Sequence, residues 1–169
     1  MKLLTPDHVF RDITCITLDF LRQNGIEGLV LDVDNTLTAH GSQELRADIA
    51  QWVNDMRAAG VLLMIASNNT KKRVSPFARR LGLPFVSFSL KPSPKWLLAA
   101  RRLWRLPKSR MALVGDQFFT DVLAGNLTGV RVLLVRPIAV DTKATIVLKR
   151  KLEAPLLMRY YRRGGTLIK

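Results

Sequence analysis

The sequence predicts an α/β protein with a three-layer, Rossmann-like architecture around a central parallel sheet. Short runs of consecutive apolar residues recur along the chain, as in strands that are buried on both faces. They alternate with segments whose apolar residues recur every three or four positions, as in helices that cover a sheet. The 169 residues, 48% of them hydrophobic, suit one compact domain with a sizeable core.

Five apolar runs predict the strands, at residues 28–33, 61–66, 84–88, 111–115 and 130–135. Helices are expected between them, over 43–59, about 74–81, about 94–104 and around 118–123. An amphipathic N-terminal helix is expected over about 7–22, because Val9, Ile13, Ile16 and Phe20 recur at helical spacing. The single domain 1–169 thus has a core of about 28–135 and a basic C-terminal segment of about 143–169.

The charge of the chain points to an anionic partner. The formal net charge is +14, which implies attraction to nucleic acid, the ribosome, anionic lipid or a phosphorylated substrate. The one cysteine, Cys15, excludes an intrachain disulfide and fits a reducing compartment. No apolar run reaches the length of a membrane span, and the N-terminus lacks the pattern of a signal peptide. We therefore expect a cytoplasmic protein, at most peripheral at the inner face of the membrane.

Two carboxylates follow the first apolar run, in the segment 32–37, Asp-Val-Asp-Asn-Thr-Leu. Anions this close repel each other unless a cation or a shared proton intervenes. Further polar residues follow later strands: Ser67, Lys91, Asp116 and Asp121. Because ligands bind at the carboxyl ends of strands in an open parallel sheet, these side chains are expected to meet in one crevice. Carboxylates suit a cation and a hydroxyl with an ammonium suits an anion, so phosphate with Mg²⁺ is the expected ligand pair.

These segments resemble the four motifs of the haloacid dehalogenase (HAD) superfamily of phosphatases, subfamily IIIA. Residues 32–37 match the first motif, Ser67 the second, Lys91-Pro92 the third, and 115–121, Gly-Asp-Gln-Phe-Phe-Thr-Asp, the fourth. The wording of the first and fourth motifs is most similar to the YqeG-type branch, whose eukaryotic relatives dephosphorylate phosphatidylglycerophosphate. The resemblance implies a Mg²⁺-dependent phosphomonoester hydrolase that acts through an aspartyl-phosphate intermediate.

The resemblance also implies a role for each residue. Asp32 would be the nucleophile, and Asp34 the general acid and then the general base. Mg²⁺ would be held by the Asp32 carboxylate, the backbone carbonyl of Asp34 and Asp116. Ser67, Asn68 and Lys91 would bind phosphate, with Lys91 also stabilising the transition state. Asp121 would orient the metal shell or Lys91, unless it is an ordinary solvated helical residue.

Two assignments stay open at this stage. Lys95 competes with Lys91 as the phosphate-binding lysine, although the Lys-Pro context favours Lys91. His40 follows the first motif closely. It either contacts the substrate or is a loop histidine without a functional role.

The lengths of the segments between the motifs bear on the size of the substrate. Many members of the superfamily insert a cap domain after the first motif or between the second and third, and neither stretch here has room for one. An open site suits a phosphate displayed on something large. The leading expectation is phosphatidylglycerophosphate; the alternatives are nucleic-acid ends, phosphoproteins, or an RNA- or ribosome-binding module with little turnover.

The C-terminal segment interleaves cations with apolar residues. From Lys143 onward it holds one acid, Glu153, among many lysines and arginines, and Tyr160 and Tyr161 are adjacent. This pattern suits an anionic membrane surface, RNA or ribosome contact, or a helix that packs on its own domain.

Overall fold

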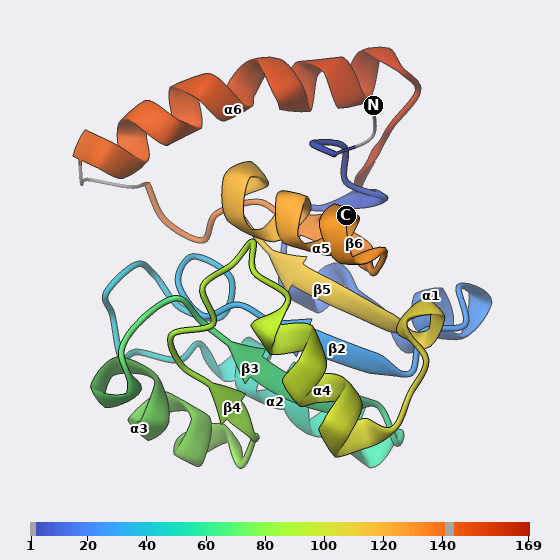
Figure 1. Cartoon of the computed structure of the whole chain (residues 1–169), viewed down its shortest axis with the longest axis vertical. Helices are drawn as coiled ribbons and strands as arrows, with labels where there is room; N and C mark the ends of the chain where they lie inside the picture. The colour runs from blue at the N-terminus through green and yellow to red at the C-terminus, as the bar shows by residue number, and fades with distance from the viewer. Residues whose placement is uncertain (1–2, 141–143) are drawn as a thin grey trace.

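A computed structural model describes residues 3–140 and 144–169 of the chain. Seven strands form one sheet in the order β4-β3-β2-β5-β6-β1-β7, and each neighbouring pair is parallel (Figure 1). The strands are β1 His8–Phe10, β2 Gly28–Leu31, β3 Leu62–Ala66, β4 Phe85–Val86, β5 Met111–Gly115, β6 Arg131–Val135 and β7 Leu167–Ile168. The predicted α/β fold with a central parallel sheet is confirmed.

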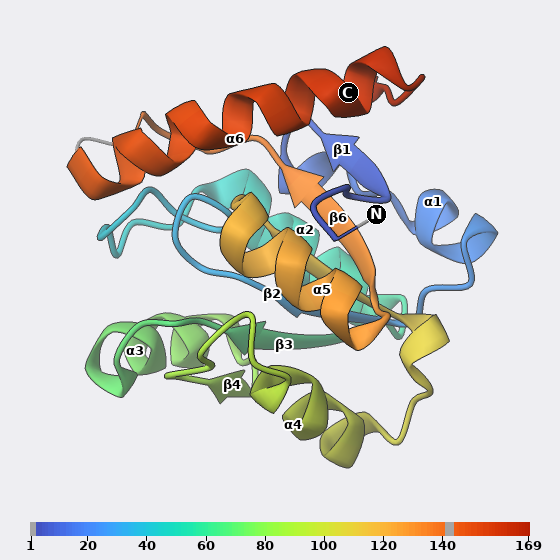
Figure 2. The ribbon, with the colours of Figure 1, turned by 45° about the horizontal axis from the view of Figure 1, so that its top comes forward.

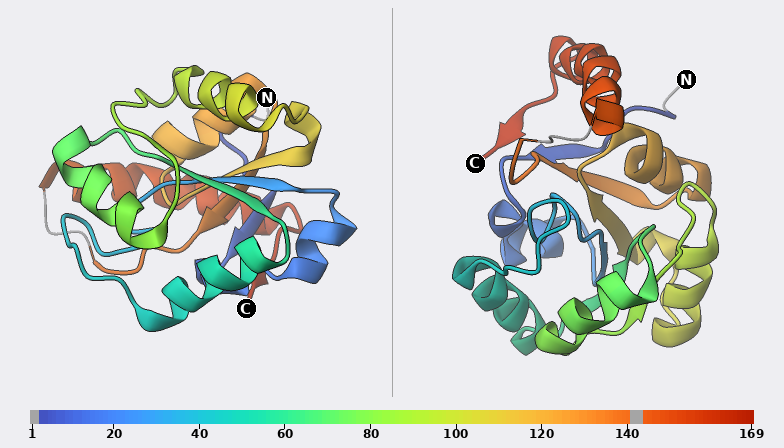
Figure 3. Two further views of the ribbon diagram at one scale, coloured as in Figure 1. Left: turned by 90° about the horizontal axis from the view of Figure 1, so that it is seen from below. Right: turned by 90° about the vertical axis from the view of Figure 1, so that its left-hand side faces the viewer.

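Helices cover both faces of the sheet (Figures 1 and 3). The α-helices are α1 Leu18–Gln23, α2 Ala47–Ala58, α3 Lys71–Leu81, α4 Lys95–Trp104, α5 Leu123–Thr128 and α6 Ala144–Arg162. Two short 3₁₀ helices, η1 Ile13–Cys15 and η2 Lys108–Arg110, and a π-helix, η3 Phe118–Val122, complete the described elements. Residues of α1, α2 and α3 pack on one face of the sheet, and residues of α4, α5 and α6 pack on the other.

Strand β2 shows why the apolar runs are unbroken. All four of its residues are buried, and successive side chains point to opposite faces. Leu29 and Leu31 join the core that contains α2, whereas Val30 joins the core that contains α4. Because both faces are covered, both sets of side chains must be apolar, and the polar residues begin where the strand ends.

The predicted N-terminal helix over about 7–22 is wrong in its first half. Residues 8–10 form β1, which pairs with β6 on one side and with β7 on the other. The helix begins only at Leu18, where the Thr17 side chain accepts a hydrogen bond from the Phe20 backbone N–H and caps it. Helical spacing of apolar residues does not reveal a three-residue strand whose partners lie more than 120 residues away.

The basic C-terminal segment folds into α6 and β7. Figure 2 shows α6 running along the side of the sheet formed by β1 and β6. Its inner residues Leu156, Leu157 and Tyr160 pack against those strands and η3. Packing on its own domain is therefore one role of this segment. Lys143 lies outside the described residues. None of the helices in the described part of the chain is long and apolar enough to cross a membrane.

Candidate active site

The residues singled out from the sequence meet at the carboxyl ends of the central strands. A pocket of about 210 Å³ lies there. It is lined by Asp32, Asp34, His40, Ser67, Asn68, Asn69, Lys91, Gln117, Thr120, Ile146 and Lys149. These residues come from the segments that follow β2, β3 and β4, from the start of η3 after β5, and from the first turns of α6. Parallel strands bring their polar ends to one edge of the sheet, as the sequence predicted.

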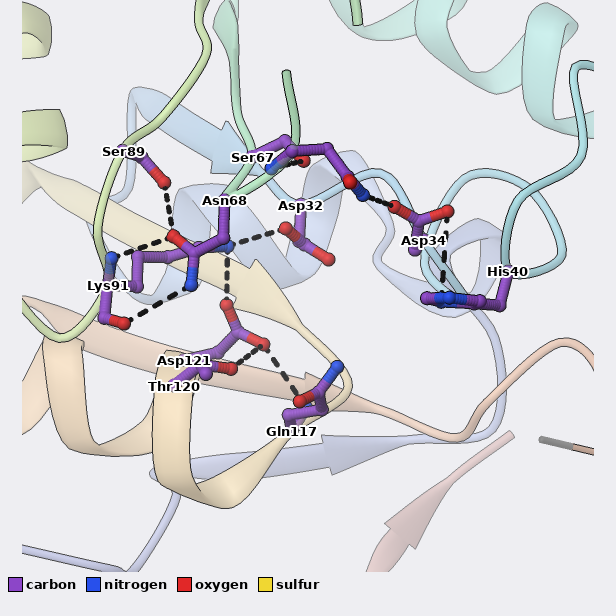
Figure 4. Close-up of polar contacts among 11 residues, drawn as sticks. Asp32, Asp34, His40, Ser67, Asn68, Ser89, Lys91, Gln117, Thr120 and Asp121 are labelled. Carbon is purple, nitrogen blue, oxygen red and sulfur yellow. Dashed lines mark hydrogen bonds and ion pairs between the residues drawn. The ribbon is translucent and has the colours of Figure 1, made fainter. Parts of the chain in front are cut away.

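Lys91 lies between two carboxylates at the base of this pocket (Figure 4). Its Nζ is 2.6 Å from Oδ1 of Asp32 and 2.7 Å from Oδ1 of Asp121. All three side chains are buried. Burial raises the pKa of Asp32 to about 7; the ammonium of Lys91 works against this, and Asp121 adds to it. One ammonium shared by two carboxylates leaves this group of side chains with an excess of negative charge.

The loop that carries Lys91 is held by Asn68. The Asn68 Oδ1 accepts hydrogen bonds from the Lys91 backbone N–H at 2.7 Å and from the Ser89 hydroxyl at 2.8 Å. The Asn68 amide donates to the Lys91 carbonyl oxygen at 3.2 Å. Lys95 instead donates to the Phe88 carbonyl oxygen, on the exposed side of the loop. The structure thus places Lys91, and not Lys95, against Asp32, and it engages the Asn68 side chain in supporting Lys91.

Asp34 is held by a different set of partners. Its Oδ1 accepts hydrogen bonds from the Gly41 backbone N–H at 2.8 Å and from Nη2 of Arg73 at 2.9 Å, and Oδ2 accepts one from the Asn69 amide. Burial alone would raise the pKa of Asp34, but these hydrogen bonds and the guanidinium outweigh burial and lower it. His40 lies nearby, with Nδ1 3.9 Å from the same carboxylate.

Asp116 receives a guanidinium from α6. Arg150 donates to the Asp116 backbone carbonyl oxygen at 2.7 Å and forms an ion pair with its Oδ2. Glu153, one helical turn later, accepts from Arg150 at 3.1 Å and from the Phe118 backbone N–H at 2.8 Å. Burial raises the pKa of Asp116 well above its usual range, with Arg150 opposing and Asp121 and Asp32 adding to the effect. Helix α6 is thereby attached to the end of β5.

The buried charges at this edge suit a divalent cation. Oxygen atoms of Asp32, Asp116 and Asp121 lie within 4.8 Å of one another. Oδ1 of Asp116 is buried and has no hydrogen-bond partner among the residues that the structure describes. Four buried carboxylates, those three and Glu153, face two cationic side chains, Lys91 and Arg150. When all four carboxylates are ionised, this group of described side chains carries two negative charges more than positive ones, and carboxylate oxygens are the ligands that Mg²⁺ prefers. The residues therefore fit this metal.

Asp121 depends on a close approach of the backbone. It lies on the π-helix η3, and its Oδ2 accepts from the Gln117 backbone N–H at 3.2 Å. A Cβ added at Gly115 would lie 2.2 Å from Cγ of Asp121, so only glycine fits at this strand end. The Gly-Asp pair of the fourth motif thus has a steric cause as well as a chemical one.

Ser67 directly follows β3 and is buried in the wall of the pocket. Its hydroxyl accepts a hydrogen bond from the Asn69 backbone N–H at 3.2 Å.

Sequence reasoning missed Arg73, Asn69, Arg150 and Glu153. Arg73 and Asn69 belong to no recognisable pattern; they reach Asp34 only because α3 begins beside the first motif. A signal existed for the other two residues. Glu153 is the one acid in a strongly basic segment, and a lone acid at helical spacing from an arginine indicates a specific ion pair.

Two family models match the chain. A HAD-hydrolase-like family matches residues 90–140, and a mitochondrial phosphatidylglycerophosphate (PGP) phosphatase family matches residues 1–76. The first range contains Lys91, Asp116 and Asp121, and the second contains Asp32, Asp34 and Ser67.

Two curated relatives agree with these matches, and a solved structure has a similar fold. The chain is 32% identical to the "Probable phosphatase YqeG" of Bacillus subtilis, over 96% of this chain and 95% of that protein. It is 25% identical to "Phosphatidylglycerophosphate phosphatase 1, chloroplastic/mitochondrial" of Arabidopsis thaliana, over 96% of this chain but only 50% of the plant protein. The fold is similar to that of 4-nitrophenylphosphatase from Thermotoga maritima, with a TM-score of 0.58 and 13% identity over 70% of this chain and 89% of that one.

Proposed function

Because the chain belongs to the HAD-like phosphatases, in the group of YqeG, we propose that it is a Mg²⁺-dependent phosphomonoesterase with Asp32 as nucleophile. The contact of 2.6 Å between Lys91 and Asp32 carries this proposal. The ammonium holds one carboxylate oxygen at the base of the pocket and is placed to stabilise a phosphoryl group bound there.

The reaction would proceed in two displacements. In the first, a carboxylate oxygen of Asp32 attacks phosphorus, the phosphorus–oxygen bond to the alcohol breaks, and an aspartyl phosphate forms. Asp34 gives a proton to the departing alkoxide oxygen. In the second, water attacks phosphorus, Asp34 takes its proton, and phosphate and free Asp32 are released.

Several side chains support this chemistry without exchanging protons. Ser67 and the Lys91 ammonium bind phosphoryl oxygens, and Asn68 holds the Lys91 loop while its exposed flank borders the phosphate. Asp32, the backbone carbonyl of Asp34 and Asp116 would hold Mg²⁺, with Asp121 orienting Lys91. The metal, when bound, neutralises the charge between the nucleophile and the phosphoryl group.

The substrate class proposed is a lipid phosphate, phosphatidylglycerophosphate, at an anionic membrane surface. The match to the PGP phosphatase family over residues 1–76 supports it, as does the plant relative, although the chain spans half of that relative's length. The pocket also supports it, because the connection from β2 to α2 covers only residues 32–46 and leaves the pocket open to a large substrate.

A substrate panel tests the proposal. Phosphate release from phosphatidylglycerophosphate in mixed micelles is measured with Mg²⁺ and with chelator, beside a 5′-phosphorylated oligonucleotide and a phosphopeptide at equal concentration. We expect the lipid to be preferred, chelator to abolish release, and Asp32→Asn to be inactive. Preference for the oligonucleotide or the peptide would overturn the lipid assignment, and release by Asp32→Asn would overturn the nucleophile.

The intermediate can be tested separately. In Asp34→Asn, the attacking water lacks its base. With 4-nitrophenyl phosphate, whose leaving group departs without a proton from Asp34, the aspartyl phosphate should still form, break down at least about 100-fold more slowly and accumulate. Mass analysis of the acid-quenched variant should find one phosphoryl group on the peptide that contains Asp32. A phosphoryl group on another peptide, or none during measurable turnover, would contradict this mechanism.

A further inference from the structure

Two large apolar side chains lie exposed on the loop that carries Lys91. Phe88 is 49% exposed and Leu90 is 60% exposed, whereas Ser89 and Lys91 between and after them are buried. Both exposed residues have positive φ angles, 46° and 54°, a conformation that bulky side chains rarely adopt. The backbone therefore turns the catalytic lysine inward and the apolar side chains outward, and strain of this kind is typical of functional segments.

The first turns of α6 present a similar surface. Ile146 and Lys149 line the pocket, while Leu148 and Leu152, one helical turn apart, are 60% and 57% exposed. Lys149 and Lys151 are also exposed beside them. The one acid of this helix, Glu153, is buried against the domain, so the outward side of α6 carries no negative charge.

Both segments border the same edge of the sheet. Seen toward the carboxyl ends of the strands (Figure 3, right), α6 lies above them and the loop after β4 lies to one side. The pocket, which contains Lys91 from the loop and Lys149 from the helix, opens between the two. We call Phe88, Leu90, Leu148, Lys149, Lys151 and Leu152 the apolar-basic rim.

We propose that the apolar-basic rim docks on an anionic phospholipid bilayer and presents the pocket to the lipid headgroups. The inference rests on the proposed function for its biological meaning, because Lys149 of the rim lines the phosphatase pocket and so does Lys91, the neighbour of Leu90 in the chain. Exposed leucine and phenylalanine side chains enter the boundary between headgroups and acyl chains, and the lysines pair with anionic headgroups. RNA phosphates would pair with the lysines, but RNA offers no apolar surface to Leu90, Leu148 and Leu152. A bilayer contacts both kinds of side chain and therefore fits the rim better.

Vesicle flotation of the full chain tests the docking without turnover. Vesicles of phosphatidylcholine with phosphatidylglycerol are compared with vesicles of phosphatidylcholine alone. We expect binding only to the anionic vesicles, and about tenfold weaker binding for Leu148→Gln/Leu152→Gln, in which glutamine keeps the helix propensity. Phe88→Gln/Leu90→Gln tests the loop half of the rim and should weaken binding similarly.

A matched control is available at the opposite edge of the sheet. Leu103 lies in the last turn of α4 and Leu127 in the last turn of α5, and both are more than half exposed. Leu103→Gln/Leu127→Gln should bind vesicles as the unaltered protein does. Leu148→Gln/Leu152→Gln should keep its melting temperature and its turnover of a soluble phosphate ester, which separates a docking defect from misfolding.

Three outcomes would overturn the docking surface: no binding to anionic vesicles, equal losses in the rim and control variants, or rim variants that lose RNA binding while keeping vesicle binding. Failure of the proposed function looks different. A protein that binds anionic vesicles through the rim but releases no phosphate from phosphatidylglycerophosphate would retain the docking surface and lose the lipid substrate.

Discussion

Arg150 on α6 binds Asp116 at the end of β5 through both its backbone carbonyl oxygen, at 2.7 Å, and its carboxylate. The two residues are 34 positions apart in the chain. The contact brings the basic C-terminal helix into the group of buried charges at the pocket, where Glu153 also accepts from Arg150. The C-terminal helix therefore contributes to the electrostatics of the site as well as to the surface around it.

Replacing Arg150 should make the protein more dependent on a metal. Arg150→Met leaves Asp116 and Glu153 without their shared cation, and we expect a loss of about 2 kcal/mol in the free energy of unfolding, since the guanidinium is partly exposed. Mg²⁺ should then raise the melting temperature more in the variant than in the unaltered protein. Differential scanning calorimetry measures both, and Lys151→Met, an exposed neighbour, is the control. An equal response to Mg²⁺ in all three proteins would contradict this account.

Lys91 and Lys95 should differ sharply on substitution. Lys91→Met removes the ammonium shared by Asp32 and Asp121, so we expect loss of turnover and destabilisation by roughly 3 kcal/mol or more from two buried, unpaired carboxylates. Lys95→Met loses only a hydrogen bond to the Phe88 carbonyl oxygen and should remain active. Turnover of a soluble phosphate ester and urea unfolding decide the matter; an active Lys91→Met would remove this lysine from the mechanism.

Arg73 should set the pH range of activity through Asp34. The guanidinium and the Gly41 amide lower the pKa of Asp34 against the effect of burial, so removing the guanidinium raises it. If Asp34 must be protonated to serve as the acid, the alkaline limb of the kcat/KM profile moves to higher pH in Arg73→Met. The pH profile of a soluble ester measures this. Arg79→Met, on the same helix, is the control. If the alkaline limb of the profile is unchanged in Arg73→Met, Asp34 is not the group whose titration causes that limb.

Stability without metal should fall as the pH rises from about 4 to about 7. Asp32 has a pKa raised to about 7 by burial, so the folded protein binds its proton more tightly than the unfolded chain does. The free energy of unfolding then decreases through that window, by on the order of a few kcal/mol. The pKa of Asp34 is lowered, so its contribution to the free energy of unfolding increases as the pH rises. That increase is already complete by about pH 5 and does not affect the change at higher pH.

Urea unfolding at pH 5 and pH 8, with chelator and with Mg²⁺, measures this dependence. Asp32→Asn should lose part of the difference between the two pH values, because Asp116 and Glu153, whose pKa values burial also raises, contribute in the same direction. Mg²⁺ should reduce the difference in the unaltered protein. The variant comparison also removes the contribution of His8, whose pKa is lowered by burial and which acts in the other direction. A variant with the full pH dependence would show that Asp32 does not cause it.

The chain alone determined the central sheet and the residues at its carboxyl edge. Strands such as β2 and β5 are buried on both faces, so they must be apolar throughout, and Asp32 and Asp116 stand out where each ends. Asn35, in the same segment as Asp32, adopts the left-handed conformation with φ of 57°, which asparagine tolerates. These patterns are local in the sequence. Because the strands are parallel, their carboxyl ends lie at one edge of the sheet, and the residues that follow them meet in one crevice.

Only the tertiary structure decided which charges neutralise one another. Strand β1 has only three residues and is stabilised by pairing with the distant strands β6 and β7. The spacing of apolar residues along the chain therefore predicted a helix for residues 8–10. Arg73 reaches Asp34 across 39 residues, and Arg150 reaches Asp116 across 34. Burial makes such pairs necessary, because an isolated charge away from water is costly. Which distant side chain supplies the partner depends on where helices α3 and α6 pack, and no local pattern in the chain specifies that.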